Sequence, residues 1–434
     1  MLIISILVVR LFQVSKKSTN RAWLSIIGIG ENGVAGLCEQ ARRLIAAADV
    51  VYGGARHLEL AAELVGGEAK IWQNPLENSI NEILSLAPSS QSLTPKICVL
   101  ASGDPFCYGI GATLARHIPV QEMLVIPAPS CFSLAAARLG WALQDIVTIG
   151  LNARALENII PHLQPNAKIL ALSTDETTPK LLAELLEKKG FAEAKMWVLE
   201  HLGGDKENII FYQSSNHPII QSSSFARLNM IALEIPAHLT KQALPLASGL
   251  PDDLFEHDGQ LTKREIRAIT LSALAPRRGE LLWDIGLGAG SVAIEWLLSH
   301  PANRAIGFEK NPERAARAGQ NAKNLGVPHL QIIEGSAPEI LANAEAPDAV
   351  FIGGGGGNLA VIEAAYNALK NGGRLVVNAV TLETESQLIA AHKKYGGNII
   401  RIGIDRAEDV GSMTGLRPAM RVMQWSAIKK DLAK

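Results

Sequence analysis

The stretch Leu281–Ser291, which reads LLWDIGLGAGS, decides the fold of the second half of the chain. The run LLWDI is apolar except for one aspartate, which is typical of a buried parallel strand. Three glycines follow at alternate positions, and the apolar pattern of a helix begins at Ser291. Small residues allow the backbone to approach a ligand closely, and the start of a helix offers free N–H groups. The stretch therefore predicts a strand, a ligand-binding turn and a helix.

The spacing of the glycines distinguishes between two kinds of ligand. A dinucleotide turn requires Gly-x-Gly-x-x-Gly or Ala, and Ser291 stands where the last Gly or Ala of that motif would be. The segment instead has the form Asp-x-Gly-x-Gly-x-Gly, which is found with S-adenosylmethionine (SAM). We therefore expect this cofactor to bind at Asp284, Gly286, Gly288 and Gly290.

Three segments further along the chain agree with a SAM site. Glu309 ends the next predicted strand, where a carboxylate can accept both ribose hydroxyls. Gly335, Ser336 and Ala337 end the third strand and are expected to border the adenine, and Gly353 follows the fourth. Each feature is weak alone, because a glycine turn can serve packing and a carboxylate can simply be solvated. Together, in this strand order, they predict a SAM-binding domain.

The strand series beyond residue 279 predicts the sheet itself. Strands fit 280–285, 304–309, 330–334, 348–352, 374–378, 399–404 and 420–425. Helix-like stretches separate consecutive members until the last, which follows a segment too short for a crossover helix. A parallel neighbour needs such a crossover, so the last strand is expected to be antiparallel. Six parallel strands and one antiparallel strand make the Rossmann-like, seven-stranded sheet of a class I methyltransferase.

A family resemblance appears at residues 252–267, DDLFEHDGQLTKREIR, and at residues 347–356, PDAVFIGGGG. Together with the glycine turn, these runs resemble the C-terminal methyltransferases of the cobalamin pathway over residues 251–427. The resemblance implies methylation of carbon 15 of a precorrin ring and loss of the carbon-12 acetate carboxylate. Leu287 and Ala289 depart from the commoner family residues but leave the three glycines intact.

A polycarboxylate substrate of this kind needs cationic anchors. Lys263, Arg264 and Arg417 are the candidates, and His257 or Asp258 could handle a proton. Other roles remain open for these residues. The run TKRE at 262–265 also fits a capping box at a helix start, and Arg417 could be an exposed charge in a loop before the last strand.

The first half opens with a second glycine turn. Gly28, Gly30 and Gly33 satisfy Gly-x-Gly-x-x-Gly between a predicted strand at 24–29 and a predicted helix at 34–48. With Asp49 as a ribose carboxylate, the pattern would predict a dinucleotide site and an NAD-dependent oxidoreductase. Against this alternative, Asp49 precedes the second strand, at 50–52, whereas a ribose contact belongs at a strand's carboxyl end.

Two further ligand-type turns change the interpretation of the first half. Ser102, Gly103 and Asp104 follow a predicted strand at 96–101, and Pro129 and Ser130 follow another at 123–126. Further strands are expected at 168–172, 195–200 and 230–235. With ADVVYGG at 48–54, these turns resemble the tetrapyrrole methylase family over residues 24–236, and most closely the branch that methylates carbon 5 of the precorrin ring. The resemblance implies a two-lobed α/β fold that binds SAM in the cleft between its lobes.

Alternatives remain for single residues of the first half. The Gly28 turn could be purely structural, and Asp104 could cap the segment that follows it. Arg56 and Arg138 could bind substrate carboxylates or be solvated charges.

Two SAM-binding folds in one chain suggest two transfers to one substrate. The fused pair resembles the decarboxylating precorrin-6Y methyltransferases, which implies one SAM site per domain and a precorrin substrate. Whether that substrate contains cobalt stays open, and we expect the metal-free ring. Neither alkylation of an electron-rich ring carbon nor loss of a carboxylate into the conjugated ring requires a further cofactor. A homo-oligomer is implied by both families.

Composition limits the remaining classes of function. The 434 residues include 41 Lys and Arg against 42 Asp and Glu, a net charge of −1 that does not favour nucleic-acid binding. No apolar run is long enough to span a bilayer, and the apolar run at 1–9 stops at Arg10, so we expect no membrane association. The cysteines, Cys38, Cys98, Cys107 and Cys131, lack metal-ligand spacing and fit reduced thiols of a cytoplasmic enzyme, with no metal site.

The domain division that we predict has four parts. Residues 1–22 form an N-terminal extension, 23–236 the tetrapyrrole methylase domain, 237–250 a linker and 251–434 the class I methyltransferase domain.

Overall fold

The computed structural model describes residues 22–88, 95–152, 154–215, 220–221, 223–354 and 357–430. Nearly all of the predicted N-terminal extension therefore lies outside the described residues, as do Gly355 and Gly356. The chain forms two compact units. The first consists of residues 1–153, 168–188 and 192–234, and the second of residues 154–167, 189–191 and 235–434.

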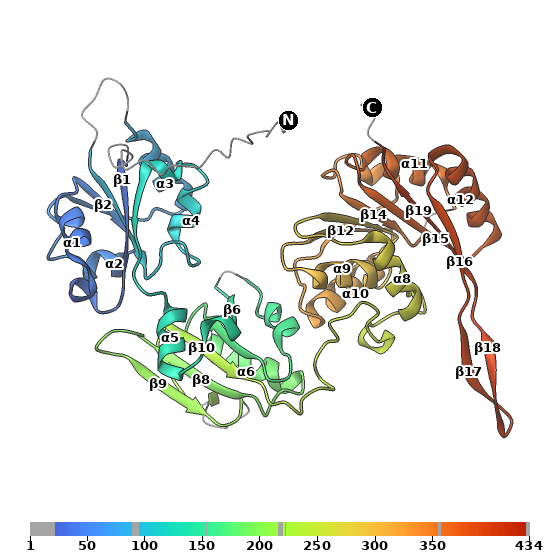
Figure 1. The fold of residues 1–434 in the computed structure, drawn as a ribbon, viewed down its shortest axis with the longest axis horizontal. Helices are drawn as coiled ribbons and strands as arrows, with labels where there is room; N and C mark the ends of the chain where they lie inside the picture. The colour runs from blue at the N-terminus through green and yellow to red at the C-terminus, as the bar shows by residue number, and fades with distance from the viewer. Residues whose placement is uncertain are drawn as a thin grey trace, which may run out of the picture. The chain divides into compact units, whose positions relative to one another are not determined.

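The first unit begins with a parallel sheet in the order β3-β2-β4-β1-β5. Figure 1 labels β1 and β2 of this sheet, with α1 and α2 nearby. Side chains on β1 alternate between two cores, so that Ile26 packs on one face of the sheet and Ile27 on the other. The strands are β1 (Leu24–Ile29), β2 (Val50–Gly53), β3 (Glu68–Ile71), β4 (Ile97–Ser102) and β5 (Met123–Ile126). The helices are α1 (Glu39–Ala46), α2 (Ala55–Leu60), α3 (Leu76–Ser85) and α4 (Ile110–Leu114).

The second sheet of this unit has the order β6-β7-β10-β8-β9, and all its pairs except β6–β7 are antiparallel. Its strands are β6 (Ile146–Gly150), β7 (Lys168–Leu172), β8 (Lys195–Glu200), β9 (Asn208–Tyr212) and β10 (Asn229–Glu234). Helix α5 (Cys131–Leu139) precedes the sheet in the chain, and α6 (Thr178–Lys188) joins β7 to β8. Two sheets in one unit agree with the two-lobed fold that the sequence predicted.

The second unit contains the predicted seven-stranded sheet, in the order β13-β12-β11-β14-β15-β19-β16. Only β19 runs antiparallel to its two neighbours, which confirms the class I methyltransferase topology. The strands are β11 (Leu281–Ile285), β12 (Arg304–Glu309), β13 (Gln331–Glu334), β14 (Ala349–Ile352), β15 (Arg374–Ala379), β16 (Asn398–Ile402) and β19 (Val422–Ile428). The helices are α8 (Arg264–Leu274), α9 (Ser291–Ser299), α10 (Pro312–Asn324), α11 (Leu359–Ala368) and α12 (Leu382–Tyr395).

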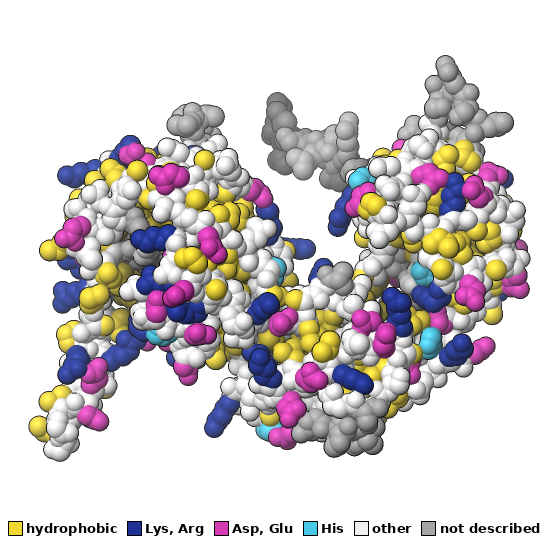
Figure 2. Space-filling view, turned by 180° about the vertical axis from the view of Figure 1, so that it is seen from behind, with side chains coloured by type: hydrophobic (Ala, Val, Ile, Leu, Met, Phe, Trp, Pro, Cys, Tyr) yellow, Lys and Arg dark blue, Asp and Glu magenta, His cyan; other side chains and the backbone are white. Residues whose placement is uncertain are grey.

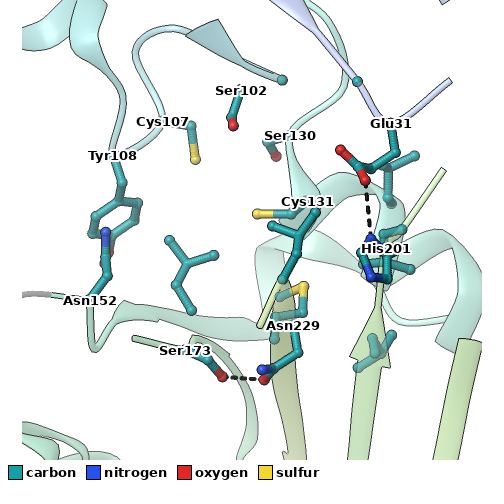
Figure 3. Close-up of a pocket in the computed structure, with 18 of the residues that line it drawn as sticks. Glu31, Ser102, Cys107, Tyr108, Ser130, Cys131, Asn152, Ser173, His201 and Asn229 are labelled. Atoms are coloured by element: carbon teal, nitrogen blue, oxygen red, sulfur yellow. Dashed lines mark hydrogen bonds and ion pairs between the residues drawn. The ribbon is translucent and has the colours of Figure 1, made fainter. Parts of the chain in front are cut away.

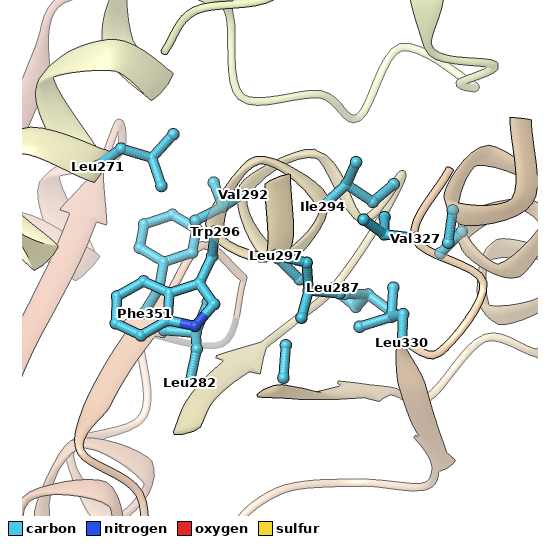
Figure 4. Packing of buried hydrophobic residues seen from close by; sticks show 14 of the residues in the cluster. Leu271, Leu282, Leu287, Val292, Ile294, Trp296, Leu297, Val327, Leu330 and Phe351 are labelled. Carbon is cyan, nitrogen blue, oxygen red and sulfur yellow. The ribbon is translucent and has the colours of Figure 1, made fainter. Parts of the chain in front are cut away.

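Two apolar cores cover the faces of this sheet. One, shown in Figure 4, packs Leu271 of α8 and Trp296 of α9 with Leu282 and Phe351 of the sheet. The other contains Trp425, whose indole N–H donates to the Gly396 carbonyl at 2.9 Å. Because both faces of the sheet are covered, its strands are continuous apolar runs. The carboxyl ends of the parallel strands lie at the edge of the sheet, where a ligand site can form.

Two local expectations were wrong, and one open alternative is excluded. The segment 34–48 is not one helix: a 3-10 turn covers Gly33–Gly36, and α1 begins only after Cys38, whose backbone is extended. Helix α8 does not use Thr262 as its cap; Lys263 holds the N-cap position without a side-chain hydrogen bond. The segment before the last strand is not a loop but a hairpin of β17 (Asp405–Val410) and β18 (Met413–Pro418).

The hairpin leaves apolar side chains in solvent. Val410, Met413 and Leu416 are exposed by 59%, 73% and 73%. At its base, Arg406 pairs with Glu265 of α8. Figure 2 shows the narrow projection with apolar side chains near its tip.

Candidate cofactor sites

The glycine turn after β11 requires glycine at each of its three positions. Gly286, Gly288 and Gly290 have φ values of +76°, +58° and +78°, which L side chains rarely adopt. A Cβ on Gly286 would also lie 2.7 Å from the backbone of Gly354. The turn is therefore fixed by conformation, and Gly286 and Gly288 remain partly exposed, as a SAM cradle needs.

Two carboxylates brace this turn from adjacent strands. Asp284 is 1% exposed, and its Oδ2 accepts from the Ala293 N–H at 3.0 Å. Burial, with the charge of Glu309 as a lesser cause, raises the pKa of Asp284 to about 8. Glu309 accepts from the Gly288 N–H at 2.9 Å and from the Asn311 N–H at 3.0 Å. Each carboxylate oxygen can accept more than one hydrogen bond, so Glu309 can also receive a ribose hydroxyl.

The other predicted SAM residues lie at the same edge of the sheet. Gly335 follows β13 and donates its N–H to the Glu309 carbonyl at 2.9 Å, with Ser336 and Ala337 directly after it. Gly353 follows β14 and donates to the Ile285 carbonyl at 3.1 Å. The structure thus brings the predicted residues of four strand ends together, and the arrangement fits SAM.

A buried asparagine, which the sequence analysis missed, holds a loop beside the glycine turn. The Asn321 side-chain amide donates to the carbonyls of Glu256 and Ala289 and accepts from the Glu256 N–H, each at 2.9 Å. The Gln260 carbonyl also lies 3.3 Å from the Cβ position of Gly288. An asparagine on the apolar face of a predicted helix was the available signal. The loop 256–260, with its two proton-handling candidates, therefore lies at the turn.

The two candidates in that loop have different environments. His257 Nδ1 accepts from the Gly259 N–H at 3.0 Å. Asp258 contacts Arg314 at 2.7 Å and Arg317 at 3.3 Å, and the hydrogen bond from Arg314 is the main reason that its pKa falls to about 2. Asp258 therefore stays ionised near neutral pH and is a poor proton carrier.

The predicted anchors surround the start of α8. Lys263 Nζ lies 3.8 Å from the Asp252 carboxylate. Arg417 lies on β18 opposite Arg406 and contacts Glu408 at 3.0 Å. Because Arg406 pairs with Glu265, the base of the hairpin lies beside the helix start where Lys263 is found.

The first unit contains a cavity of about 640 Å³ (Figure 3). The ends of β1 and β4 and the start of α5 line one part of it, and residues at the ends of β7, β8 and β10 line another. Its wall includes five residues predicted to bind SAM: Gly30, Ser102, Gly103, Pro129 and Ser130. A cavity of this volume fits a ligand of the size of SAM.

Three other predicted residues do not line the cavity but shape the turns that form its wall. A Cβ on Gly28 would lie 1.8 Å from the Gly103 carbonyl oxygen, so glycine allows the first two turns to meet. Gly33 has a φ of +54° and donates to the Gly30 carbonyl. Asp104 accepts from the Phe106 N–H at 2.8 Å, which is the local capping role.

The structure argues against the dinucleotide alternative. Asp49 lies at the start of β2, and its Oδ2 accepts from the Lys96 N–H at 2.7 Å. A ribose carboxylate would have to follow Gly53, at the other end of that strand.

The cavity also has a charged wall that the sequence analysis largely missed. Glu31 bridges Arg56 and His201, and Arg56 donates to Ser102 Oγ at 2.8 Å. Burial lowers the pKa of Arg56, and burial together with the charge of Arg56 lowers that of His57 to about 4. Glu31 lies inside the glycine motif, but nothing in the sequence indicated its partner. Arg138, the other proposed anchor, is paired with Glu207.

Within the described ranges, no helix is long and apolar enough to cross a membrane. The same residues contain no cluster of three or more His, Cys, Asp or Glu side chains that could hold a metal ion.

Comparisons with known proteins assign both halves of the chain. The family of tetrapyrrole (corrin/porphyrin) methylases matches residues 24–214, and the precorrin methyltransferase domain matches residues 253–429. A precorrin-6Y C(5,15)-methyltransferase [decarboxylating] of Sinorhizobium sp is 53% identical over 94% of this chain and 96% of its own. The protein of that name from Mycobacterium tuberculosis (strain CDC 1551 / Oshkosh) is 36% identical over 93% of this chain and 99% of its own.

A shorter relative matches only part of the chain. A probable cobalt-precorrin-6B C(15)-methyltransferase (decarboxylating) of Saccharolobus solfataricus is 38% identical over 34% of this chain and 77% of its own. The matches over nearly the whole chain, together with the two folds, define the family. The chain belongs to the precorrin-6Y C5,15-methyltransferases (decarboxylating), which are SAM-dependent enzymes of cobalamin biosynthesis.

Proposed function

We propose that the chain has two independent SAM sites, one in each unit, and that they serve different ring carbons. The second unit methylates carbon 15 and removes the carbon-12 acetate carboxylate, and the first methylates carbon 5. The observation that carries this proposal is the presence of two unlike sites: the glycine cradle of β11–β14 and the 640 Å³ cavity of the first unit. The relative from Saccharolobus, whose name describes carbon-15 methylation and decarboxylation alone, matches a share of this chain that one domain would occupy.

The domain limits that we propose remain 23–236 and 251–434, joined by 237–250 after an extension of residues 1–22.

The second site needs to bind, orient and desolvate its substrate. SAM supplies an activated methyl group on a sulfonium when bound. We propose that Asp284, Glu309 and the cradle glycines hold it, with Gly335, Ser336, Ala337 and Gly353 at the adenine side. Lys263 and Arg417 would pair with carboxylates of the precorrin, because Lys263 precedes α8 and Arg417 lies on the hairpin whose base pairs with that helix start. His257 is the proton-handling candidate that we retain, since Asp258 is committed to Arg314.

The first site has a different lining. We propose that Gly30, Ser102, Gly103, Pro129 and Ser130 contact SAM, while Gly28, Gly33 and Asp104 shape the turns that present them. Ser130 caps α5 by accepting from the Ser133 N–H at 3.1 Å, so that its hydroxyl position is fixed.

One substitution in each site tests whether the two units methylate different ring carbons. Leu134 lines the cavity, so Leu134→Trp should obstruct part of it with a bulkier ring, while Leu134→Met keeps a similar volume as the matched control. With the full chain, precorrin-6Y and methyl-labelled SAM, Leu134→Trp should yield a product with one new methyl group that has still lost carbon dioxide. At a SAM concentration that saturates only the intact first site, Glu309→Gln should give the complementary product, methylated at carbon 5 only. Loss of both methylations in either variant, with the fold intact, would contradict two separate sites.

We propose the metal-free ring as the substrate, because the relatives that match over nearly the whole chain are named for precorrin-6Y. The relative from Saccharolobus is named for a cobalt-precorrin, so the alternative substrate is the cobalt-containing ring. Parallel assays with metal-free and cobalt-loaded substrate decide between them: the higher kcat/KM should belong to the metal-free ring.

We further propose a cytoplasmic homo-oligomer. Support for assembly comes from the hairpin β17–β18, since isolated two-stranded hairpins are marginally stable and its apolar side chains are exposed. Light scattering should give a mass above that of one chain, and Met413→Asp with Leu416→Asp should reduce it. Leu246→Asp, at a site 88% exposed, is the matched control. A monomeric wild-type protein would contradict the proposal.

A further inference from the structure

Glu31 and His201 contact each other in the wall of the cavity of the first unit. Glu31 follows β1 in the first sheet, and His201 follows β8 in the second. The Oε2 atom of Glu31 lies 3.2 Å from Nδ1 of His201, and both residues line the cavity (Figure 3). The two sheets thus contribute one half each of a carboxylate–imidazole pair.

The backbone of His201 is unusual. Its φ is +48°, a left-handed conformation that a residue other than glycine adopts only at some cost. Hydrogen bonds hold this conformation: the His201 N–H donates to the Leu228 carbonyl at 3.2 Å, and the His201 carbonyl accepts from Gly204 at 3.1 Å. A side chain at Gly204 would collide with Cβ of Glu31. The local chain is therefore built to bring the ring of His201 to the Glu31 carboxylate.

The contact determines which nitrogen of the ring is free. An ionised carboxylate only accepts, so Glu31 places the proton of a neutral His201 on Nδ1. The lone pair then lies on Nε2, for which the described residues provide no hydrogen-bond partner. Arg56 pairs with the same carboxylate.

The remaining ionisable groups of the cavity wall are less suited to accept a proton. Arg56 and Arg227 are cations, and burial raises the pKa of the Cys131 thiol to about 11 and that of Cys107 above its usual value. Tyr108 donates its hydroxyl to the Thr148 carbonyl at 3.4 Å. His201 supplies the only imidazole among the described lining residues of the cavity.

We propose that His201 is the catalytic base of the carbon-5 methylation and that Glu31 is its positioning residue. The inference rests on the proposed assignment of carbon 5 to the first unit. A meso carbon of a tetrapyrrole bears a hydrogen, so the methylated intermediate carries a positive charge that must be discharged. The C–H bond of that carbon breaks, its electron pair restores the conjugation of the ring, and the proton goes to Nε2 of His201. Glu31 stabilises the imidazolium through Nδ1.

The test uses the full chain and a substrate that carries deuterium at carbon 5. His201→Asn and His201→Gly both tolerate the left-handed backbone, which limits damage to the fold. Each should lower kcat for the carbon-5 methylation by about 100-fold, because that is the usual contribution of a positioned base. A primary isotope effect that the wild type lacks should appear, and free imidazole should restore part of the rate in His201→Gly. Titration with S-adenosylhomocysteine should show the affinity of the first site unchanged.

Controls separate this inference from the proposed function. His117→Asn, at an exposed position outside the cavity, should behave as wild type. Glu31→Gln should lower kcat less than His201→Asn and should shift the pH profile. The glutamine oxygen can still accept the hydrogen bond from Arg56, but the negative charge beside His201 is removed. The groups around the pair that also titrate or carry charge are Arg56, Arg227, His57 and the Arg138–Glu207 pair.

Unchanged kcat in His201→Asn, or a rate loss without an isotope effect, would overturn the role of His201. If Leu134→Trp kept carbon-5 methylation, the assignment of carbon 5 to this unit would fail instead.

Discussion

The carboxylate of Glu309 accepts a hydrogen bond from the N–H of Gly288 at 2.9 Å. This contact joins the end of β12 to the turn after β11, and it fixes the acidic side chain at the edge where the proposed SAM site lies. Removing the charge should therefore affect binding more than folding.

Glu309→Gln tests that expectation. The variant keeps an acceptor for Gly288 but weakens a charge-assisted hydrogen bond to the ribose, which is worth about 1.5–3 kcal/mol, or roughly a 10- to 100-fold loss of affinity. Titration calorimetry with S-adenosylhomocysteine should show this loss at one of two sites. Glu313→Gln, in the first turn of α10, is the control. Equal affinities in the two variants would show that Glu309 does not contact the ligand.

Gly288→Ala separates backbone strain from ligand binding. Gly288 and Gly372 have φ values of +58° and +74°, and a Cβ at Gly372 would meet nothing within 4 Å. Alanine at either position should cost about 1–2 kcal/mol of unfolding free energy because both backbones are left-handed. Only Gly288→Ala should also weaken S-adenosylhomocysteine binding. Weakened binding in Gly372→Ala as well would mean that the effect is general destabilisation.

Asp284 makes the stability of the second unit depend on pH. Its pKa is raised from 3.8 to about 8, so the folded state favours the protonated carboxyl. The unfolded chain releases this proton first as the pH rises, and stability should fall between about pH 4 and pH 8. Asp284→Asn cannot ionise and should lose this dependence. Thermal unfolding across that range measures it, and parallel curves for the two proteins would contradict the prediction.

Asn321→Ala should destabilise the loop beside the cradle. The substitution removes three hydrogen bonds and leaves the Ala289 carbonyl without its side-chain donor, at a cost of about 2–3 kcal/mol. Methylation at carbon 15 should fall along with the protease resistance of the loop 256–260, whereas carbon-5 methylation should not change. Gln320→Ala, one residue away and exposed, is the matched control. Intact carbon-15 activity would show that the loop position is not needed.

The regular parts of the fold could be predicted from sequence because their physics is local. Buried parallel strands are continuous apolar runs, and the order of turns and helices along 281–352 determines the sheet. The strands that were missed, at 68–71, 146–150 and 208–212, include polar or exposed positions and so lack that signal. The hairpin was missed for the same reason: every residue of 405–410 is exposed.

The same contrast applies to the candidate sites: residues in a local sequence motif could be predicted, and residues that meet only in the folded chain could not. The cradle glycines could be predicted because they belong to one contiguous motif, and Glu309 because it ends the next predicted strand. Positive φ values explain why the motif contains glycine. Glu31 and His201 meet only after two sheets have formed, so no spacing in the sequence relates them. Asn321 was hidden in the same way, since its partners precede it by many residues.

The most direct test of the account is mass spectrometry of the product formed by the full chain from precorrin-6Y and methyl-labelled SAM. The product should have gained two labelled methyl groups and lost one carbon dioxide, with Glu309→Gln and Leu134→Trp each removing a different methyl. A single methylation in the wild type, or the same methyl lost in both variants, would contradict it.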